Sequence, residues 1–406
     1  MNHSATFHAA ADWTANSERN AVMVDAALRI AVVTETYPPE INGVALTLRQ
    51  WVTSLSRRGH RLLLIRPRQM RHDQPHADDA EQTVLVAGVP LPSYKALRFG
   101  LPCRKRLQAE FTAFVPDVIY IATQGPLGGS ALNAARRLGI PAITGFHTNF
   151  DHYSRYYGLG LLKPIIQGFL RRFHNRSHAT LVPTDELRQR MLAQGYRDCR
   201  VLARGVDTQV FNPVHRSPTL REHWGVDAKQ PIVLYVGRLA AEKNLDLAVR
   251  TFREMQTVRA DARFVLVGDG PMTATLQAEH PDFIFCGMQV GETLARHYAS
   301  ADIFLFASVT ETFGNVIVEA MASGLAPLAF DYAAAREHVQ HRHSGFLAPL
   351  GDEDEFTRLA HELVQSEATW RQLGQAARQV AERLDWQRIH SQLESLFFEF
   401  ANEARA

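Results

Sequence analysis

Two glutamates stand eight positions apart in the segment SVTETFGNVIVEAMASGLAPLAF, and their surroundings predict a helix that begins between them. Gly314 and Asn315 are typical of a helix start, and Gly324 of a helix end. On one continuous helix Glu311 and Glu319 would point ~80° apart, so a loop has to aim the first glutamate. Carboxylates accept hydrogen bonds from neighbouring hydroxyls, and a helix N-terminus attracts a phosphate. The segment therefore suits a sugar and its phosphate, although two exposed surface acids explain the spacing alone equally well.

Two cations lie in the segment GRLAAEKN, at the end of an expected strand at residues 231–238. Arg238 and Lys243 are expected on a loop at the carboxyl end of that strand, where one diphosphate can meet both. Each close pair of unit charges contributes up to ~4 kcal/mol at an effective dielectric constant near 20, before desolvation is subtracted. Solvated loop cations are an equally good interpretation. The sequence GDGP at residues 268–271 predicts a turn, and its glycines also permit close approach of the backbone to a ligand.

Three residues in the first part of the chain are further candidates. Gly43 lies in YPPEINGVA, where a helix is expected to begin, and His147 lies in GFHTNF at the end of an expected strand. Lone histidines at strand ends are mostly structural, so His147 gains no functional weight from its position alone. Asp151 follows closely, and two roles explain it equally well: orienting an acceptor hydroxyl or capping the next helix.

The composition limits the function classes. The chain has 406 residues, 44 Lys and Arg, 42 Asp and Glu, a formal net charge of +2 and 46% hydrophobic residues. A nucleic-acid binder would carry a strong basic excess, so we expect no nucleic-acid partner and only local anion binding. Cys103, Cys199 and Cys286 are odd in number and widely spaced, which predicts reduced thiols in a cytoplasmic protein. No run of ~18 apolar residues predicts a membrane span.

Strand and helix patterns alternate along the chain twice, which predicts two doubly wound α/β units. Such alternation produces parallel sheets covered on both faces, and a ligand is expected in the cleft between the units, at the carboxyl ends of the strands. The expected strands, some with adjoining turns, lie at residues 28–39, 61–67, 116–123 and 140–147 in the first unit and at 231–238, 262–270, 283–287, 301–308 and 325–330 in the second.

The expected boundaries follow from this alternation. Residues 1–27 are polar and rich in alanine and lack the apolar core of a signal peptide, so we expect a disordered tail in which Met23 is an alternative start. Residues 28–210 and residues 211–384 are expected to form two Rossmann-like domains. The polar stretch VHRSPTLREHWGVDAKQ is interpreted as a linker. A helix in residues 385–406 is compatible with packing on either unit, including a return to the first.

Together these segments resemble the GT-B retaining glycosyltransferases of family 4. The resemblance rests on GR…EKN, GDGP and ETFGNVIVEAMASG in the second unit and on YPPEINGVA, GFHTNF and RGVDTQVFNP before it, in the family's order over residues 29–350. Asn42 departs from the pattern, because many members carry a glycine before the one that matches Gly43. HTNFDHYSRYYGLG is most similar to bacterial GDP-mannose-dependent mannosyltransferases and lipid hexosyltransferases. The resemblance implies an acceptor on the first unit and a nucleotide-sugar donor on the second.

The resemblance also implies roles for single residues. Arg238 and Lys243 would neutralise the donor diphosphate as the glycosidic bond breaks, and these fixed cations would make a metal or other cofactor unnecessary. Glu319 would bind the ribose, and His147 would hydrogen-bond the transferred sugar. Gly43 would let the first helix approach the phosphates. The sugar hydroxyls and phosphate would be held by the run Glu311, Phe313, Gly314, Asn315 and Val316.

The implied activity is transfer of a hexose, foremost mannose from GDP-mannose, to a lipid or lipid-linked glycan. Transfer from UDP-glucose or UDP-glucuronate to diacylglycerol is the nearest alternative. A nucleotide-sugar 2-epimerase shares the two-unit architecture but needs no acceptor. A nicotinamide oxidoreductase is disfavoured because no G-x-G-x-x-G follows RIAVVT. A binding module without catalysis is disfavoured by the complete set of charged residues.

Two segments, residues 158–176 and 94–106, combine basic and apolar residues in a way that suits an anionic bilayer surface. Each basic residue near such a surface contributes ~1 kcal/mol. A core helix with a basic rim also explains the first segment, and a surface loop explains the second. Our hypothesis is peripheral contact with the cytoplasmic face of the inner membrane. The first segment contains Leu162, Lys163, Ile165, Ile166, Phe169, Leu170, Arg171, Arg172, Phe173 and Arg176, and the second Tyr94, Lys95, Leu97, Arg98, Phe99, Leu101, Arg104, Lys105 and Arg106.

Overall fold

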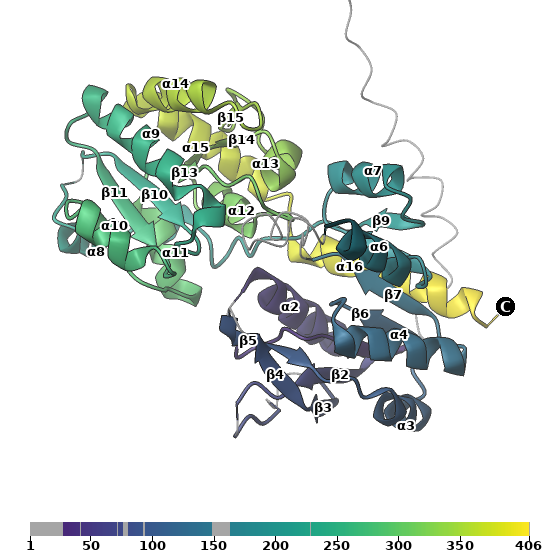
Figure 1. Cartoon of the computed structure of the whole chain (residues 1–406). Helices are drawn as coiled ribbons and strands as arrows, with labels where there is room; N and C mark the ends of the chain where they lie inside the picture. Colours follow the sequence, from purple (N-terminus) through teal and green to yellow (C-terminus); the bar gives the residue numbers. More distant parts are fainter. Residues whose placement is uncertain are drawn as a thin grey trace, which may run out of the picture.

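The computed structural model describes residues 27–40, 42–70, 72–75, 80–91, 94–147, 163–227 and 229–405. Nearly all of the expected tail, and Asp151, therefore lie outside the described residues. The described chain forms two successive α/β units, each built on a parallel sheet (Figure 1). The prediction of two doubly wound units is confirmed.

The sheet of the first unit has seven strands among the described residues, in the order β3-β2-β1-β6-β7-β8-β9. Both of its faces are buried, because Ile30 and Val32 of β1 enter one apolar cluster while Ala31 and Val33 enter another. This double burial explains the continuous apolar character of the strand. The strands are β1 (Arg29–Val33), β2 (Arg61–Pro67), β3 (Gln82–Val86), β6 (Val118–Ile121), β7 (Ala142–Gly145), β8 (Ala179–Val182) and β9 (Cys199–Val201).

The strand order of the first sheet reverses beside β1, which pairs with β2 on one side and β6 on the other. Loops that leave such a reversal diverge and form the usual ligand crevice of a doubly wound sheet. The helices of this unit are α2 (Gly43–Arg57), α3 (Arg104–Phe114), α4 (Pro126–Leu138), α6 (Lys163–His174) and α7 (Asp185–Ala193), and a hairpin joins β4 (Gly88–Leu91) to β5 (Tyr94–Gly100).

The second unit contains a parallel sheet of six strands among the described residues, in the order β12-β11-β10-β13-β14-β15. Its strands are β10 (Ile232–Val236), β11 (Arg263–Val267), β12 (Ile284–Phe285), β13 (Ile303–Phe306), β14 (Ala326–Phe330) and β15 (Phe346–Ala348). Its helices are η2 (Pro213–His215), α8 (Pro218–His223), η3 (Ala241–Lys243), α9 (Leu245–Val258), α10 (Thr273–Glu279), α11 (Gly291–Ser300), α12 (Asn315–Ala322), α13 (Ala333–His338), α14 (Glu353–Val364) and α15 (Glu367–Ala381).

The polar stretch interpreted as a linker is instead a packed part of the second unit. It contains α8 and the last two residues of η2, and Arg221 of α8 is buried against Asp302 and the Ser300 carbonyl. Trp224 lies in the apolar core. The linker interpretation was wrong because polar side chains that are paired inside the protein look, in sequence, like solvated ones.

The chain passes from the first unit to the second near Gly205 and returns near Trp386. Val206 pairs with Asp385 at this crossing, and an added Cβ on Gly205 would lie 2.8 Å from the Trp386 ring. Arg378 donates hydrogen bonds to three carbonyl oxygens around the crossing. The two passages therefore pack on each other and form a single compact joint.

The last helix, α16 (Trp386–Glu403), lies along the first unit (Figure 1). Its buried Leu393 and Phe397 belong to the same apolar cluster as Trp51 of α2 and Tyr120 of β6. The helix thus closes one face of the first sheet, although it follows the second unit in sequence. None of the helices in the described ranges has the length and hydropathy that a bilayer crossing requires.

Phe397→Ala is expected to destabilise the first unit by about 3–5 kcal/mol, because it opens a cavity beneath α16. Denaturant unfolding followed by circular dichroism measures the change. Ser395→Ala, on the exposed side of the same helix, is the matched control and should stay within about 0.5 kcal/mol of the parent. Equal stability of the two variants would show that α16 does not hold this face.

Candidate active site

An ion pair between Lys243 and Glu311 lies at the carboxyl edge of the second sheet. Lys243 ends η3 after β10, and Glu311 lies on the loop between β13 and α12. Lys243 Nζ is 2.5 Å from Glu311 Oε1, and Ser308 Oγ donates to the same oxygen over 2.6 Å. Burial acts to raise the pKa of Glu311, but Lys243, Ser308 and Arg204 outweigh it and hold the pKa below its ordinary value. Glu311 is therefore an oriented carboxylate that can still accept hydroxyl hydrogen bonds.

Arg238 lies at the same edge and pairs with a different carboxylate. Its Nη2 is 3.1 Å from Oε1 of Glu242, whose side chain is almost completely buried. Burial lowers the pKa of Arg238, and Glu242 partly restores it. The two cations predicted to meet a diphosphate thus come from one loop, and each is held by an acid.

The helix α12 begins at Asn315, as the sequence predicts. Gly314 has a φ of +93°, a left-handed conformation that favours glycine, and an added Cβ would lie 3.4 Å from Glu311 Cγ. The Gly314 carbonyl accepts the first hydrogen bond of the helix, from the Ile317 N–H. The N–H groups of Asn315 and Val316 therefore have no acceptor within the helix. Phe313, two residues before the helix, is buried. The helix start presents its positive end beside Glu311.

Glu319 lies one turn inside α12 and accepts a hydrogen bond from Tyr298 of α11. The Tyr298 Oη donates to Glu319 Oε2 over 2.9 Å. Burial raises the pKa of Glu319 to about 7, although the hydrogen bond from Tyr298 opposes the shift. The charge of this carboxylate therefore changes near neutral pH, unlike that of Glu311.

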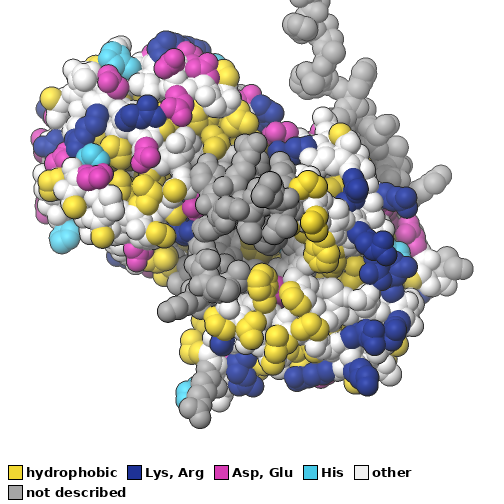
Figure 2. All heavy atoms as spheres, viewed as in Figure 1, with side chains coloured by type: hydrophobic (Ala, Val, Ile, Leu, Met, Phe, Trp, Pro, Cys, Tyr) yellow, Lys and Arg dark blue, Asp and Glu magenta, His cyan; other side chains and the backbone are white. Residues whose placement is uncertain are grey.

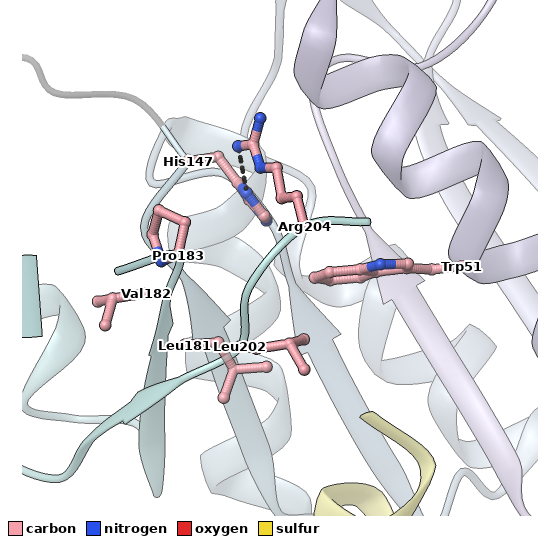
Figure 3. A pocket seen from close by; sticks show the side chains of 7 residues that line it. All are labelled: Trp51, His147, Leu181, Val182, Pro183, Leu202 and Arg204. Atoms are coloured by element: carbon pink, nitrogen blue, oxygen red, sulfur yellow. Dashed lines mark hydrogen bonds between the residues drawn. The ribbon is translucent and has the colours of Figure 1, made fainter. Parts of the chain in front are cut away.

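His147 follows β7 and is nearly buried, and both of its ring nitrogens have protein partners. Nε2 is 2.6 Å from Tyr120 Oη. Nδ1 is 3.3 Å from Arg204 Nη2, a contact drawn as a dashed line in Figure 3. A guanidinium only donates, so Nδ1 accepts and the proton lies on Nε2. Burial, and then the charge of Arg204, lower the pKa of His147 well below its ordinary value, so the ring is neutral. In this arrangement neither nitrogen is open to the sugar that the resemblance implies.

A small pocket lies beside His147. Figure 3 shows that its wall combines a polar side with an apolar one. The lining residues are Trp51, His147, Leu181, Val182, Pro183, Leu202 and Arg204.

Gly43 begins α2 and faces the start of α12 across the junction of the units. An added Cβ on Gly43 would lie 3.3 Å from Asn315 Nδ2. Asn42 caps α2, because its side-chain oxygen accepts the N–H groups of Val44 and Ala45. The departure from two glycines therefore supplies a cap, and two helix N-termini approach each other at this point.

Arg204 contacts residues of both units, although no pattern in the sequence predicts a role for it. Its Nη1 donates to Asn315 Oδ1 over 3.2 Å, and its Nη2 lies against His147. Its guanidinium also lies 5.7 Å from the centre of the Phe313 ring. The only available indication was its place in RGVDTQVFNP, a segment noted for joining the domains.

Comparison with known proteins identifies the family. The profile described as Glycosyltransferase Family 4 matches residues 41–210, and that described as Glycosyl transferases group 1 matches residues 230–366. The chain is 35% identical to a GDP-mannose-dependent alpha-mannosyltransferase of Mycobacterium tuberculosis, over 82% of this chain and 89% of that protein. The chain belongs to glycosyltransferase family 4.

Two further likenesses concern sequence and fold. The glycosyltransferase is 36% identical to a GDP-mannose-dependent alpha-mannosyltransferase of Mycolicibacterium smegmatis, over 79% of this chain and 84% of that protein. It superposes on sucrose-phosphate synthase from Thermosynechococcus elongatus with a TM-score of 0.76 and 18% identity, covering 92% and 98% of the two chains. At 18% identity this similarity supports a common fold and nothing about function. The predicted GT-B fold is confirmed.

The GDGP turn of the glycosyltransferase has a structural explanation. An added Cβ would lie 1.9 Å from the Gly237 carbonyl oxygen at Gly268 and 2.3 Å from the Leu239 carbonyl oxygen at Gly270. These glycines therefore let the loop that carries Arg238 lie directly against the turn. The close approach that the glycines allow is to the chain's own backbone.

Glu35 is a second residue near the site that the sequence motifs do not include. It follows β1 where the strand order reverses, and its Oε1 accepts the Leu127 N–H over 2.9 Å at the start of α4. An added Cβ on Gly125 would overlap Glu35 Oε2 at 1.9 Å. Burial raises the pKa of Glu35 to about 7, although backbone hydrogen bonds from α4 lower it. An acid directly after a buried strand was the indication in the sequence.

The family resemblance implies that Glu319 binds the ribose of the donor, so we expect donor binding to weaken as the pH falls through about 7, where protonation removes the charge of this carboxylate. The KM for the donor should rise about fivefold from pH 8 to pH 6, the difference between a charged and a neutral hydrogen bond. Initial rates at constant ionic strength measure it. Glu319→Gln should show the higher KM at both pH values. If the KM of this variant and that of the parent rose equally from pH 8 to pH 6, a group other than Glu319 would cause the pH dependence.

Proposed function

We propose that this glycosyltransferase transfers mannose from GDP-mannose to a lipid or lipid-linked glycan and retains the anomeric configuration. The two mycobacterial relatives support the donor, since their names state GDP-mannose dependence. The observation that carries the proposal is the Lys243–Glu311 pair beside the start of α12. A cation, a carboxylate and backbone N–H groups there lie within reach of one sugar phosphate.

The diphosphate of the donor is held, in this proposal, by Arg238, Lys243 and the first N–H groups of α12. Their positive charge stabilises the negative charge that develops on the leaving group, and preorganised charges of this kind dominate many enzymatic rate enhancements. Glu319 binds the ribose hydroxyls. The chemistry calls for no metal, because the two side chains and the helix terminus supply the charge.

The sugar lies between Glu311 and His147 in this proposal, with Phe313–Asn315 beneath it. The acceptor hydroxyl attacks the anomeric carbon on the face from which the diphosphate departs. A carbon–oxygen bond to the acceptor forms as the bond to the phosphate oxygen breaks, and the hydroxyl proton passes to the leaving phosphate. Glu311 fixes the sugar hydroxyls during this step, which orients the anomeric carbon.

Lys243→Ala and Glu311→Gln are each expected to lower kcat about 10²- to 10³-fold without unfolding the protein, as the loss of an oriented transition-state contact does. Purified protein, GDP-mannose and extracted membrane lipids are incubated, and the mass of the product lipid reports transfer. Lys229→Ala, an exposed lysine of the same unit, should keep parental activity. Unchanged turnover in both site variants would overturn the site assignment.

A donor panel in the same assay separates the alternatives. GDP-mannose is expected to add one hexose to a lipid, with activity that persists in EDTA. Transfer only from UDP-glucose or UDP-glucuronate would replace the donor. A changed sugar nucleotide without any acceptor would indicate an epimerase and contradict transfer altogether.

Peripheral contact with an anionic membrane is the second part of the proposal, and a surface of the first unit supports it. Ile165 and Phe169 of α6 are 69% and 55% exposed, whereas Leu170 and Phe173 of the same helix are buried. The helix therefore has an outward apolar side as well as a core side. Figure 2 shows basic side chains gathered over α3, α4 and α6, with hydrophobic side chains next to them. The exposed basic residues of these helices are Arg104, Lys105, Arg106, Arg136, Arg137, Arg171 and Arg172, and Arg176 follows just after α6.

The double substitution Ile165→Ser/Phe169→Ser is expected to reduce co-sedimentation with phosphatidylglycerol vesicles at low salt about tenfold or more, since it removes two inserted side chains. Vesicles of phosphatidylcholine should bind the parent weakly. Leu350→Ser, an exposed apolar position of the second unit, is the control and should bind like the parent. A parent protein that stays in the supernatant with anionic vesicles would sink the membrane proposal.

A further inference from the structure

Arg204 is a buried cation placed between the two units. Its side chain leaves the crossing segment beside Gly205, the residue is only 5% exposed, and its guanidinium contacts His147 of the first unit and Asn315 of the second. Figure 3 shows the guanidinium above the small pocket, joined to His147. A residue in this position contacts both halves of the site directly.

The charge of Arg204 has no acidic partner in the described part of the chain. Its hydrogen bonds go to a neutral ring nitrogen and a neutral amide oxygen, and its buried Nε has no hydrogen-bond partner among the residues that the structure describes. Glu311 attracts it from a distance but is already bonded to Lys243 and Ser308. Burial lowers the pKa of Arg204 to about 10, so it remains charged at neutral pH. A buried charge without a counter-ion is costly, and an anionic ligand removes that cost.

Two helix N-termini add positive potential at the same place. The Cβ position of Gly43, at the start of α2, lies 3.8 Å from Arg204 Nη1, and Asn315 begins α12. The cations Arg204, Lys243 and Arg238 together outnumber the carboxylates of Glu311 and Glu242 that pair with them. An anionic ligand is therefore expected to bind where the starts of α2 and α12 approach each other.

We propose that Arg204 is a further ligand of the donor diphosphate, and that its move to the phosphate releases His147 to bind the sugar. The inference rests on the proposed function, since it assumes a nucleoside diphosphate sugar as donor. The guanidinium exchanges Asn315 and His147, which are neutral acceptors, for a charged phosphate oxygen, which is the stronger acceptor. Arg204 thereby acts both as a binding residue and as a positioning residue for His147.

The consequence for His147 follows from its tautomer. Nδ1 accepts from Arg204 and Nε2 donates to Tyr120, so only Nδ1 changes partner when the guanidinium moves. The vacated Nδ1 lone pair then accepts a hydrogen bond from a sugar hydroxyl. Binding of the phosphate and binding of the sugar are thus coupled through one side chain, and His147 recovers the role that the family resemblance implies.

Calorimetric titration with GDP and GMP tests the phosphate contact, and UDP with UMP repeats it for the other base. The parent should prefer the diphosphate, and Arg204→Gln should lose about ten- to hundredfold in GDP affinity while GMP affinity changes less than about twofold. The ratio is measured within each variant, so it does not depend on the folded fraction. Arg378→Gln, which removes another arginine from the crossing, should change thermal stability and leave the ratio as in the parent.

Asn315→Asp is the variant that keeps Arg204 in place. It puts a carboxylate at a position 3.2 Å from the guanidinium and is expected to lower GDP affinity relative to GMP, while an acid at the start of α12 supports the helix. A parental ratio in both Arg204→Gln and Asn315→Asp would overturn the inference and leave Arg204 a structural residue. A parent protein that binds none of the four nucleotides would overturn the proposed function instead.

A double-mutant cycle tests the coupling to His147. With GDP, His147→Ala should have little effect and Arg204→Gln a large one. With GDP-mannose in the absence of acceptor, the two effects should be non-additive, because Arg204 controls the His147 contact. Additive effects with GDP-mannose would show that His147 binds independently of Arg204.

Discussion

A buried cation that has no acidic partner among the described residues, next to the joint between the two units, is the constraint around which this glycosyltransferase is arranged. Lys243 and Arg238 each form an ion pair with a carboxylate, whereas the buried Arg204 hydrogen-bonds only to neutral groups among the described residues. The start of α12 adds the positive end of a helix. Such charge is unfavourable in a closed interior and favourable where a phosphate arrives. The site is therefore completed by its substrate.

The way in which the chain connects the units gives Arg204 its place. The two passages pack on each other where Val206 pairs with Asp385 and Trp386 covers Gly205. Arg204 precedes this joint directly, and its guanidinium contacts His147 of the first unit and Asn315 of the second. Phe397 and its neighbours anchor the returning helix to the first sheet. A cation next to the joint thus contacts both units.

Much of the scaffold and part of the site could be predicted from the sequence, for a definite reason. Lys243 and Glu311 follow β10 and β13, and parallel neighbours bring their carboxyl ends to one edge, so order and pattern suffice. The contact of Arg204 with His147 depends on how two distant loops fold, and no local pattern encodes it. The segment around Arg221 was mistaken for a linker because polarity in sequence does not reveal a buried partner.

Neutral partners for Arg204 are what a binding site requires. A carboxylate in place of Asn315 would form a strong pair with the guanidinium and compete with the incoming phosphate. An amide oxygen and an imidazole nitrogen satisfy the donors of the guanidinium with weaker bonds, so the exchange for a phosphate is favourable. The folded protein bears a cost in stability for this arrangement, as functional sites commonly do. When the anion binds, the guanidinium exchanges these weak hydrogen bonds for a stronger one to the phosphate. The free energy gained by this exchange contributes to the affinity for the donor.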